Sequence, residues 1–276
     1  MDIDISTVPE TVLTEASSLQ NFLVAMFVVS EQPMPRVSPI GSGTLVELEG
    51  SHYILTAAHV WNEARQAKDV GLALTASPSQ FLVPRNLIQS RQLWVRKHPE
   101  WGPDLALLQL PPSDVARIKA RKSFLNLAEQ RAAFAARPPN TLKGYWAVTG
   151  MVGEFSTVEV DHEARIIQAG IGSRAFFTAI RDTHDRAGYD YFDVGAKLEL
   201  PGTPFSFGGV SGGGLWEIGL TVAKSGDIVW DGKRQFRGVA FWESPPSRRG
   251  RRVIRCHGPH SIFKRAWASS DLPPCR

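Results

Sequence analysis

The stretches Gly41-Ser-Gly-Thr-Leu-Val46 and Ile54-Leu-Thr-Ala-Ala-His59 decide the fold. The first leads into a short apolar run and the second begins as one, as is typical of half-buried β-strands, and the second ends in a turn of small residues followed by a histidine. Farther along the chain, Asp104 opens another apolar run, and Ser211 lies in the glycine-rich run Gly208–Gly214. The sequence therefore predicts that short strands hold the residues with the most obvious chemistry.

The composition is that of an ordinary globular protein. Of the 276 residues, 43% are apolar and 21% are charged, which excludes a disordered chain, a coiled coil and a collagen-like chain. The longest unbroken apolar run, Phe22–Val29, is much shorter than the roughly 20 residues that a membrane-spanning helix needs. The 24 glycines and 19 prolines separate many short apolar stretches, so we expect an all-β protein.

The expected strands are Phe22–Ser30, Gly43–Glu49, Tyr53–Thr56, Val70–Leu74, Leu93–Arg96, Leu105–Leu110, Tyr145–Val152, Ala164–Ala169, Tyr191–Leu198, Gly214–Val222, Ile228–Trp230, Arg237–Trp242 and Arg252–Cys256. Three stretches are instead expected to be helical because of their capping residues, their helix formers or an apolar face: Glu10–Gln20, Leu127–Ala136 and His260–Ala268.

The start of the chain and its cysteines favour a reducing compartment. The chain begins Met-Asp-Ile-Asp-Ile-Ser, without the basic start and following apolar stretch of a secretory signal. Its two cysteines, Cys256 and Cys275, both lie near the end, where a bridge could tie down only the tail. We therefore expect a cytoplasmic protein that does not associate with a membrane.

The positive charge is local. Five arginines lie within residues 248–255, and without them the 27 acidic residues would slightly outnumber the remaining basic ones. The favoured interpretation of this Arg248–Arg255 cluster is a solvated, charged loop that leads into a strand. The alternative is a footprint for nucleic acid or an acidic protein partner, because clustered arginines also bind phosphates.

His59, Asp104 and Ser211 have complementary chemistry. A serine hydroxyl is a poor nucleophile at neutral pH and needs a base within hydrogen-bond reach. An imidazole that titrates near neutrality can take the proton and return it, and a buried carboxylate can hold that imidazole in one tautomer. The glycines beside Ser211 allow backbone N–H groups to converge on one point, which is the geometry of an oxyanion hole.

Together, the motifs Leu55-Thr-Ala-Ala-His59, Asp104-Leu-Ala-Leu-Leu108 and Gly209-Val-Ser-Gly-Gly213 resemble the chymotrypsin-like (trypsin-fold) serine peptidases. The order His, Asp, Ser along the chain is the order of that fold. The resemblance implies two six-stranded antiparallel β-barrels and a C-terminal helix, with a catalytic triad of His59, Asp104 and Ser211 in the cleft between the barrels. It also implies that the oxyanion hole consists of the N–H groups of Gly209 and Ser211, and that the reaction needs no metal or organic cofactor.

The same resemblance divides the chain into five parts. Residues 1–20 form an N-terminal extension, and residues 21–125 form the first barrel, with two residues of the triad. Residues 126–140 are a linker, residues 141–258 form the second barrel, and residues 259–276 are the terminal helix and tail. The expected activity is that of a serine endopeptidase acting on a protein or peptide through an acyl-enzyme intermediate.

The resemblance also suggests substrate-binding residues. Phe205 aligns near the base of the primary specificity pocket, and Phe241 and Trp242 belong to the strand that pairs with the substrate backbone. Glu243 follows at the rim of the pocket, although the favoured interpretation is that it points to water. No acid is evident at the base, which favours a small or apolar substrate residue over Arg or Lys.

The chain departs from the family around the serine. Val210 stands where secreted members have an aspartate that pairs with a newly cut N-terminal amine, so activation by N-terminal cleavage is not expected. Ala58 replaces a cysteine of the secreted relatives, in agreement with a cytoplasmic location. Because glycine broadens the accessible backbone conformations, we hypothesise that the oxyanion loop forms only with a substrate or an activating protein partner.

Two alternatives stay open. The first is a catalytically silent trypsin-fold binding module that recognises a protein or nucleic acid. The second is a metal site at Cys256, His257 and His260, which is disfavoured because only three candidate ligands cluster and neighbouring strand residues point to opposite faces.

Overall fold

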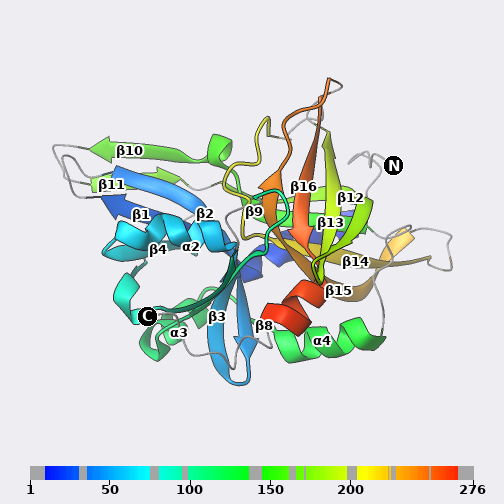
Figure 1. The fold of residues 1–276 in the computed structure, drawn as a ribbon, viewed down its shortest axis with the longest axis horizontal. Helices are drawn as coiled ribbons and strands as arrows, with labels where there is room; N and C mark the ends of the chain where they lie inside the picture. Colours follow the sequence, from blue (N-terminus) through cyan, green and yellow to red (C-terminus); the bar gives the residue numbers. More distant parts are fainter. Residues whose placement is uncertain are drawn as a thin grey trace.

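The computed structural model describes residues 10–30, 36–74, 81–94, 99–136, 145–161, 166–170, 172–197, 204–222, 224, 228–248 and 250–266. Most of these residues lie in two large antiparallel β-sheets, one from each half of the chain, with few helices (Figure 1). The all-β expectation is therefore confirmed.

The first sheet is formed by the N-terminal half of the chain. Its strands are β1 (Leu23–Ser30), β2 (Arg36–Leu48), β3 (Ser51–Thr56), β4 (Asp69–Ala73), β5 (Leu82–Pro84), β6 (Gln89–Trp94), β7 (Asp104–Gln109) and β8 (Leu125–Asn126). They follow the order β5-β4-β1-β2-β3-β7-β6 with antiparallel neighbours, while the two-residue β8 pairs with β2 in parallel. This sheet has two strands more than the six expected, because β5 and β8 are too short to leave a sequence pattern.

The second sheet is a closed six-stranded antiparallel barrel. In barrel order its strands are β12 (Ser173–Arg186), β13 (Tyr189–Lys197), β16 (Arg251–His257), β15 (Ile228–Glu243), β14 (Gly214–Val222) and β9 (Tyr145–Met151). The remaining strands, β10 (Thr157–Asp161) and β11 (Ile166–Gly170), form a separate hairpin. A closed barrel leaves no unpaired sheet edge, so this half offers a rigid support for a site.

Two expectations for this barrel were wrong. No strand was expected at β12, because residues 181–186 are mostly exposed and polar on both faces and so lack the alternation that marks a half-buried strand. The stretches Ile228–Trp230 and Arg237–Trp242 are not two strands but parts of β15, which continues through irregular register shifts.

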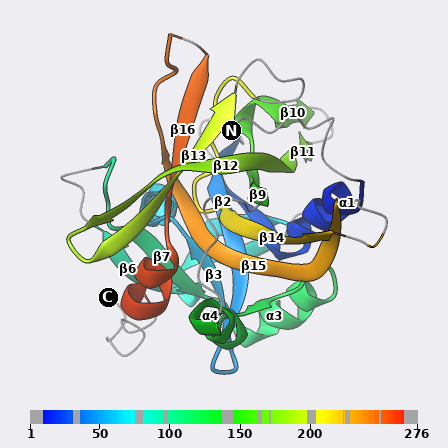
Figure 2. The same cartoon turned by 90° about the vertical axis from the view of Figure 1, so that its right-hand side faces the viewer.

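The helices are short and lie outside the sheets (Figure 2). They are α1 (Glu10–Ser18), η2 (Leu19–Phe22), α2 (Ala58–Glu63), η3 (Ala64–Gln66), η4 (Arg85–Leu87), α3 (Pro112–Lys119), α4 (Leu127–Ala136), η5 (Gly153–Phe155) and the short π-helix η6 (Ser261–Ala266). The expected helices at the start, middle and end of the chain are confirmed as α1, α4 and η6, although residues 267–268 of the last lie outside the described residues. The helices α2 and α3 were not expected.

The two halves share their apolar cores. Tyr191 and Phe241 from the second half pack in the cluster that fills the first sheet. In a second cluster, Leu105 and Leu107 of β7 lie with Trp216 of β14 and other apolar residues. Because apolar contacts run continuously from one half to the other, residues at the ends of β3, β7 and β14 are held in fixed relation.

Candidate active site

His59 and Asp104 form the best-defined contact of the candidate site. Strand β3 ends at Thr56, and His59 lies in the first turn of α2, which follows directly. The His59 Nδ1 and the Asp104 Oδ2 are 2.6 Å apart, and the backbone N–H of His59 donates to Asp104 Oδ1 at 2.9 Å. Because both carboxylate oxygens bind the same residue, the imidazole is fixed in position and its Nδ1 carries the proton.

The surroundings of His59 favour its protonated form. Burial lowers the pKa of His59, but the hydrogen bond with Asp104, the charge of Asp104 and the charge of Glu63 together raise it above its ordinary value of 6.5. Glu63 lies one turn farther along α2, and burial raises the pKa of its carboxyl. A base of this kind can accept a proton near neutral pH and hold it as an imidazolium.

His257 supports Asp104 from the second barrel. The backbone N–H of Asp104 donates to the Nε2 of His257 at 3.1 Å, and the His257 ring is fully buried and stacked on Phe241 with ring centroids 4.3 Å apart. Burial lowers the pKa of His257 to about 3, so the ring is neutral and carries its proton on Nδ1. That Nδ1 has no hydrogen-bond partner among the residues that the structure describes. Sequence reasoning considered this residue only as a metal ligand and missed this contact.

The loop that carries Ser211 packs against the strands that lead to His59. The Ser211 carbonyl accepts a hydrogen bond from the N–H of Ser42 in β2 at 2.8 Å. At Gly41, a Cβ atom would lie 2.6 Å from the side chain of Val60, the neighbour of His59, and 3.0 Å from the Ser211 carbonyl oxygen. The loop that carries Ser211 thus packs beside Gly41 and Val60, the neighbour of His59, although these contacts include no hydrogen bond between the Ser211 hydroxyl and the His59 ring.

Two backbone N–H groups of this loop are free to bind a ligand. The N–H of Val210 donates to the Phe207 carbonyl, and the N–H of Gly212 donates to the Ala240 carbonyl. The N–H groups of Gly209 and Ser211, which alternate with these two, donate to no protein acceptor within the described residues. Alternate donors that stay unpaired in an otherwise bonded loop are what an oxyanion hole requires.

Two carboxylates hold the segment before the loop. Glu154 accepts the N–H groups of Phe205 and Ser206 at 2.9 and 2.6 Å. Glu243 accepts the Ser206 hydroxyl and the Phe207 N–H, each at 2.9 Å, and its carboxylate lies 3.4 Å from the Arg252 guanidinium. The expectation that Glu243 points to water was therefore wrong, and the role of Glu154 was not foreseen.

Val210 anchors the loop by apolar contact. Its side chain is 2% exposed and lies in a core cluster of the second barrel. A Cβ atom on Gly150 of β9 would come within 2.9 Å of it, so the two residues are in close contact. The hypothesis that this loop forms only with a partner or substrate stays a prediction, but the loop described here is tied at most of its backbone groups.

The expected substrate-binding residues differ in accessibility. Phe205 is 65% exposed, and the Arg252 guanidinium lies 5.4 Å from the centre of its ring. The Trp242 side chain is half-buried, whereas that of Phe241 is buried beneath His257. The Phe241 side chain is therefore not accessible at the surface, whereas the Phe205 ring is exposed.

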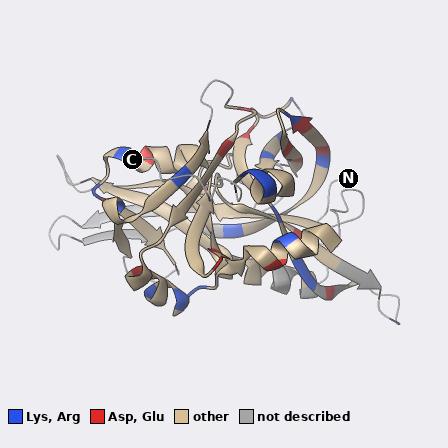
Figure 3. Cartoon of the chain, turned by 60° about the horizontal axis from the view of Figure 1, so that its bottom comes forward, with Lys and Arg blue, Asp and Glu red and all other residues tan. Residues whose placement is uncertain are grey.

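The Arg248–Arg255 cluster is not one solvated loop. Arg255 is buried and donates to both carboxylate oxygens of Asp193, at 2.7 and 2.8 Å, and to the Glu100 carbonyl at 2.8 Å. Arg252 pairs with Glu243 and donates to the Ser244 carbonyl. Lys, Arg, Asp and Glu are interspersed over the described part of the chain (Figure 3). The expectation of a solvated loop is wrong for these two arginines, because both lie in β16 and are paired with carboxylates on the neighbouring strands β13 and β15.

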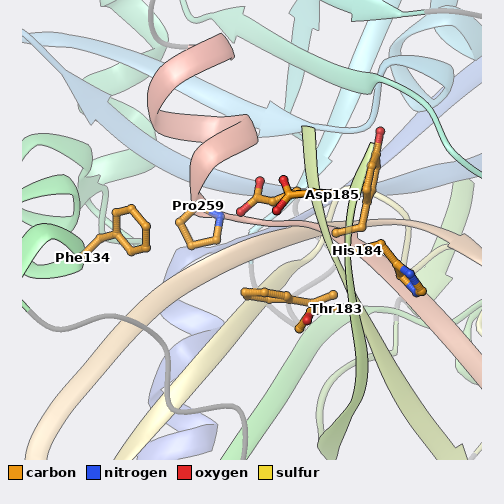
Figure 4. A pocket seen from close by; sticks show the side chains of 8 residues that line it. Phe134, Thr183, His184, Asp185 and Pro259 are labelled. Carbon is orange, nitrogen blue, oxygen red and sulfur yellow. The ribbon is translucent and has the colours of Figure 1, made fainter. Parts of the chain in front are cut away.

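A pocket of about 320 Å³ opens elsewhere on the second barrel (Figure 4). It is lined by Phe134, Thr183, His184, Asp185, Asp190, Tyr191, Phe192 and Pro259. The Asp190 carboxylate caps the C-terminal helical turn, since it accepts the N–H groups of His260 and Ser261 at 3.0 and 2.6 Å. This pocket contains no residue of the candidate site, so the site is not this cavity.

The described residues hold no cluster of three or more His, Cys, Asp or Glu side chains that could bind a metal ion. Within the same part of the chain, no helix combines the length and the apolar character needed to cross a membrane. Cys256 is buried, and Cys275 lies outside the described residues.

Comparisons with known proteins show the fold. No protein-family model matches the chain, and no curated protein matches it. Among solved structures, the chain is similar to Rv3671c from M. tuberculosis H37Rv, a serine-to-alanine mutant in its inactive form, with 15% identity, a TM-score of 0.52, and 99% of this chain and 98% of that chain covered. At this level of identity the likeness concerns the architecture alone. The chain therefore has a trypsin-like fold of two antiparallel β units.

Proposed function

We propose that the protein is a serine endopeptidase. The observation that carries the proposal is the His59–Asp104 pair, with its 2.6 Å contact, beside a loop that presents Ser211 and two unpaired N–H groups. A binding module would need none of these groups in combination, whereas acyl transfer needs a base, its orienting carboxylate, a nucleophile and oxyanion donors together.

The proposed reaction follows from the roles of these groups. Ser211 Oγ attacks the peptide carbonyl while His59 Nε2 takes the hydroxyl proton, and Asp104 stabilises the imidazolium. The carbonyl oxygen becomes negative and is bound by the N–H groups of Gly209 and Ser211. His59 then protonates the leaving amine, and the acyl group remains on Ser211. Water attacks this acyl-enzyme while His59 takes a proton from the water and returns it to Ser211 Oγ, which releases the acid. The protein side chains provide every proton transfer in this scheme.

The missing hydrogen bond between Ser211 and His59 is compatible with this role. Catalytic hydrogen bonds are often long in structures without substrate and tighten when the substrate binds. Ser211 is partly exposed, so its side chain is not enclosed by packing and can change rotamer.

The proposal extends to the substrate, the cellular location and the activation of the protein. We propose a protein or peptide substrate whose apolar or small residue meets the exposed Phe205, with the backbone beside β15. A cytoplasmic location and activation by a partner stay predictions from the sequence.

The proposal is tested with a mixture of internally quenched peptides of varied sequence. The unaltered protein is expected to raise the fluorescence, and Ser211→Ala and His59→Ala are expected to abolish the increase while retaining the thermal unfolding midpoint. Turnover that survives Ser211→Ala would contradict the proposal.

A further inference from the structure

Ser42 binds the loop that carries the candidate nucleophile at two points, the carbonyls of Gly209 and Ser211. It lies in β2 of the first sheet and is fully buried. Its hydroxyl donates to the Gly209 carbonyl at 2.7 Å and accepts the Met151 N–H at 2.8 Å. Its own N–H donates to the Ser211 carbonyl at 2.8 Å, and its carbonyl accepts the Thr56 hydroxyl at 2.6 Å. Every polar group of this residue is therefore used at the junction of the two halves.

The orientation of the Ser42 hydroxyl is fixed by its partners. A serine hydroxyl has one proton to donate and two lone pairs to accept with. The Met151 N–H can only donate, and the Gly209 carbonyl can only accept, so the hydroxyl proton must point to Gly209. The end of β9 and the loop are thus joined through one defined hydroxyl.

This contact restrains the peptide planes around the first proposed oxyanion donor. The carbonyl of Gly208 accepts the N–H of Gly153 at 2.8 Å, and because a peptide unit is planar, this fixes the direction of the Gly209 N–H in the same unit. Ser42 holds the next plane through the Gly209 carbonyl. Gly209 has a φ of +95°, a conformation from which glycine can swing freely unless both flanking planes are held.

The second donor and the nucleophile are held in the same way. The Val210 carbonyl accepts the Gly213 N–H at 2.8 Å, which directs the Ser211 N–H, and the Ser42 N–H holds the Ser211 carbonyl. One residue of the first sheet therefore sets the distance between the nucleophile and the donor two residues before it.

We propose that Ser42 is a positioning residue for the oxyanion hole, an inference that rests on the proposed peptidase function. Its hydroxyl touches no reacting atom; it keeps the Gly209 N–H aimed at the position where the oxyanion forms. Preorganised donors lower the barrier because they need no rearrangement during the reaction.

A nearby hydroxyl provides a matched control. Thr44 lies two residues farther along β2 and is 1% exposed, and its Oγ1 has no hydrogen-bond partner in the described part of the chain. Thr44→Val and Ser42→Ala each remove one buried hydroxyl from the same strand with little change in volume. Only Ser42→Ala removes a contact with the loop.

The test measures the labelling of Ser211 by a fluorophosphonate probe as a function of probe concentration and pH. Ser42→Ala is expected to lower the limiting labelling rate about tenfold, less than the 10²- to 10³-fold loss of a whole donor. The probe concentration for half-maximal rate and the pH midpoint set by His59 should stay unchanged. Thr44→Val should label like the unaltered protein, and both variants should keep its thermal unfolding midpoint within a few degrees.

A second measurement follows the loop directly. Amide hydrogen exchange of residues 204–213 should be faster in Ser42→Ala than in the unaltered protein and unchanged in Thr44→Val. Labelling of Ser42→Ala at the unaltered rate with unchanged exchange, or an equal loss in Thr44→Val, would overturn the inference while leaving the proposed function intact. An unaltered protein that is not labelled at Ser211 would overturn the proposed function and this inference with it.

Discussion

The backbone N–H of Asp104 donates a hydrogen bond to the Nε2 of His257, across 153 residues of sequence and from one β unit to the other. The acid of the proposed triad is thereby held from two directions, by His59 at its carboxylate and by His257 at its backbone. The geometry of the proposed triad therefore depends on the packing of the two halves against each other as well as on each half alone.

The buried His257 predicts a loss of stability in acid. Its pKa is lowered to about 3 by burial, while the unfolded chain binds a proton near 6.5. The unfolded state therefore takes up one more proton between these values, and each pH unit below 6.5 costs about 1.4 kcal/mol of the free energy of unfolding. His257→Gln keeps an acceptor for the Asp104 N–H but cannot bind this proton.

Denaturant unfolding at several pH values between 6.5 and 4 measures this effect. The free energy of unfolding should fall more steeply with decreasing pH in the unaltered protein than in His257→Gln. The difference between the two slopes should correspond to one proton taken up per molecule. Identical slopes for the two proteins would show that His257 is not a buried neutral imidazole.

Glu63 predicts a shift in the pH dependence of the reaction. Labelling requires neutral His59, so its rate should rise with pH around a midpoint above 6.5, since the pKa of His59 is raised. Glu63→Gln removes one of the charges that raise this pKa, and the midpoint should move to lower pH with an unchanged plateau. Glu47→Gln, which removes a carboxylate beside His52 instead, should leave the midpoint in place. A midpoint that moves upward in Glu63→Gln would contradict the proposed base.

We expect that position 212 tolerates no side chain. Its φ is +89°, and a Cβ atom there would lie 1.9 Å from the Ser42 carbonyl oxygen. Gly50 has a similar φ of +77° but nothing within 4 Å of such an atom. Gly50→Ala should lower the free energy of unfolding by about 1–2 kcal/mol, the cost of the left-handed conformation for alanine. Gly212→Ala should lower the unfolding midpoint further and should abolish labelling of Ser211 by the fluorophosphonate probe. Equal effects of the two changes would show that the loop does not pack against β2.

Asp104 predicts a large effect on turnover without loss of the fold. In Asp104→Asn, the amide cannot stabilise the imidazolium and favours the other tautomer of His59. Peptide turnover should fall by about 10⁴-fold, the order seen when a triad aspartate becomes asparagine. The near-ultraviolet circular dichroism spectrum should stay unchanged. Turnover within tenfold of the unaltered protein would remove Asp104 from the mechanism.

The residues of the candidate site could be proposed from the sequence because they lie in short sequential motifs. The runs around His59, Asp104 and Ser211 each combine a strand pattern with a turn, and such local patterns leave a clear signal. The two-barrel architecture followed from the resemblance that these motifs carry. The helix Leu127–Ala136 was also predicted with its observed bounds, because a continuous run of good helix formers needs no tertiary context.

The supporting residues could not be predicted, because their contacts join distant parts of the chain. Ser42 meets Gly209 across 167 residues, and Glu243 meets Phe207 across 36 residues, in each case through a side chain bound to backbone. Such a contact leaves no periodic pattern in the sequence. Arg255 was misread for the same reason, since its partner Asp193 lies on a neighbouring strand of the barrel.

The most direct test of the account is mass spectrometry of the protein after treatment with a fluorophosphonate probe. The account predicts a single modified peptide with the probe on Ser211, and no modification in either His59→Ala or Ser211→Ala. Modification at another residue, or none in the unaltered protein under conditions where a known serine hydrolase is fully labelled, would contradict it.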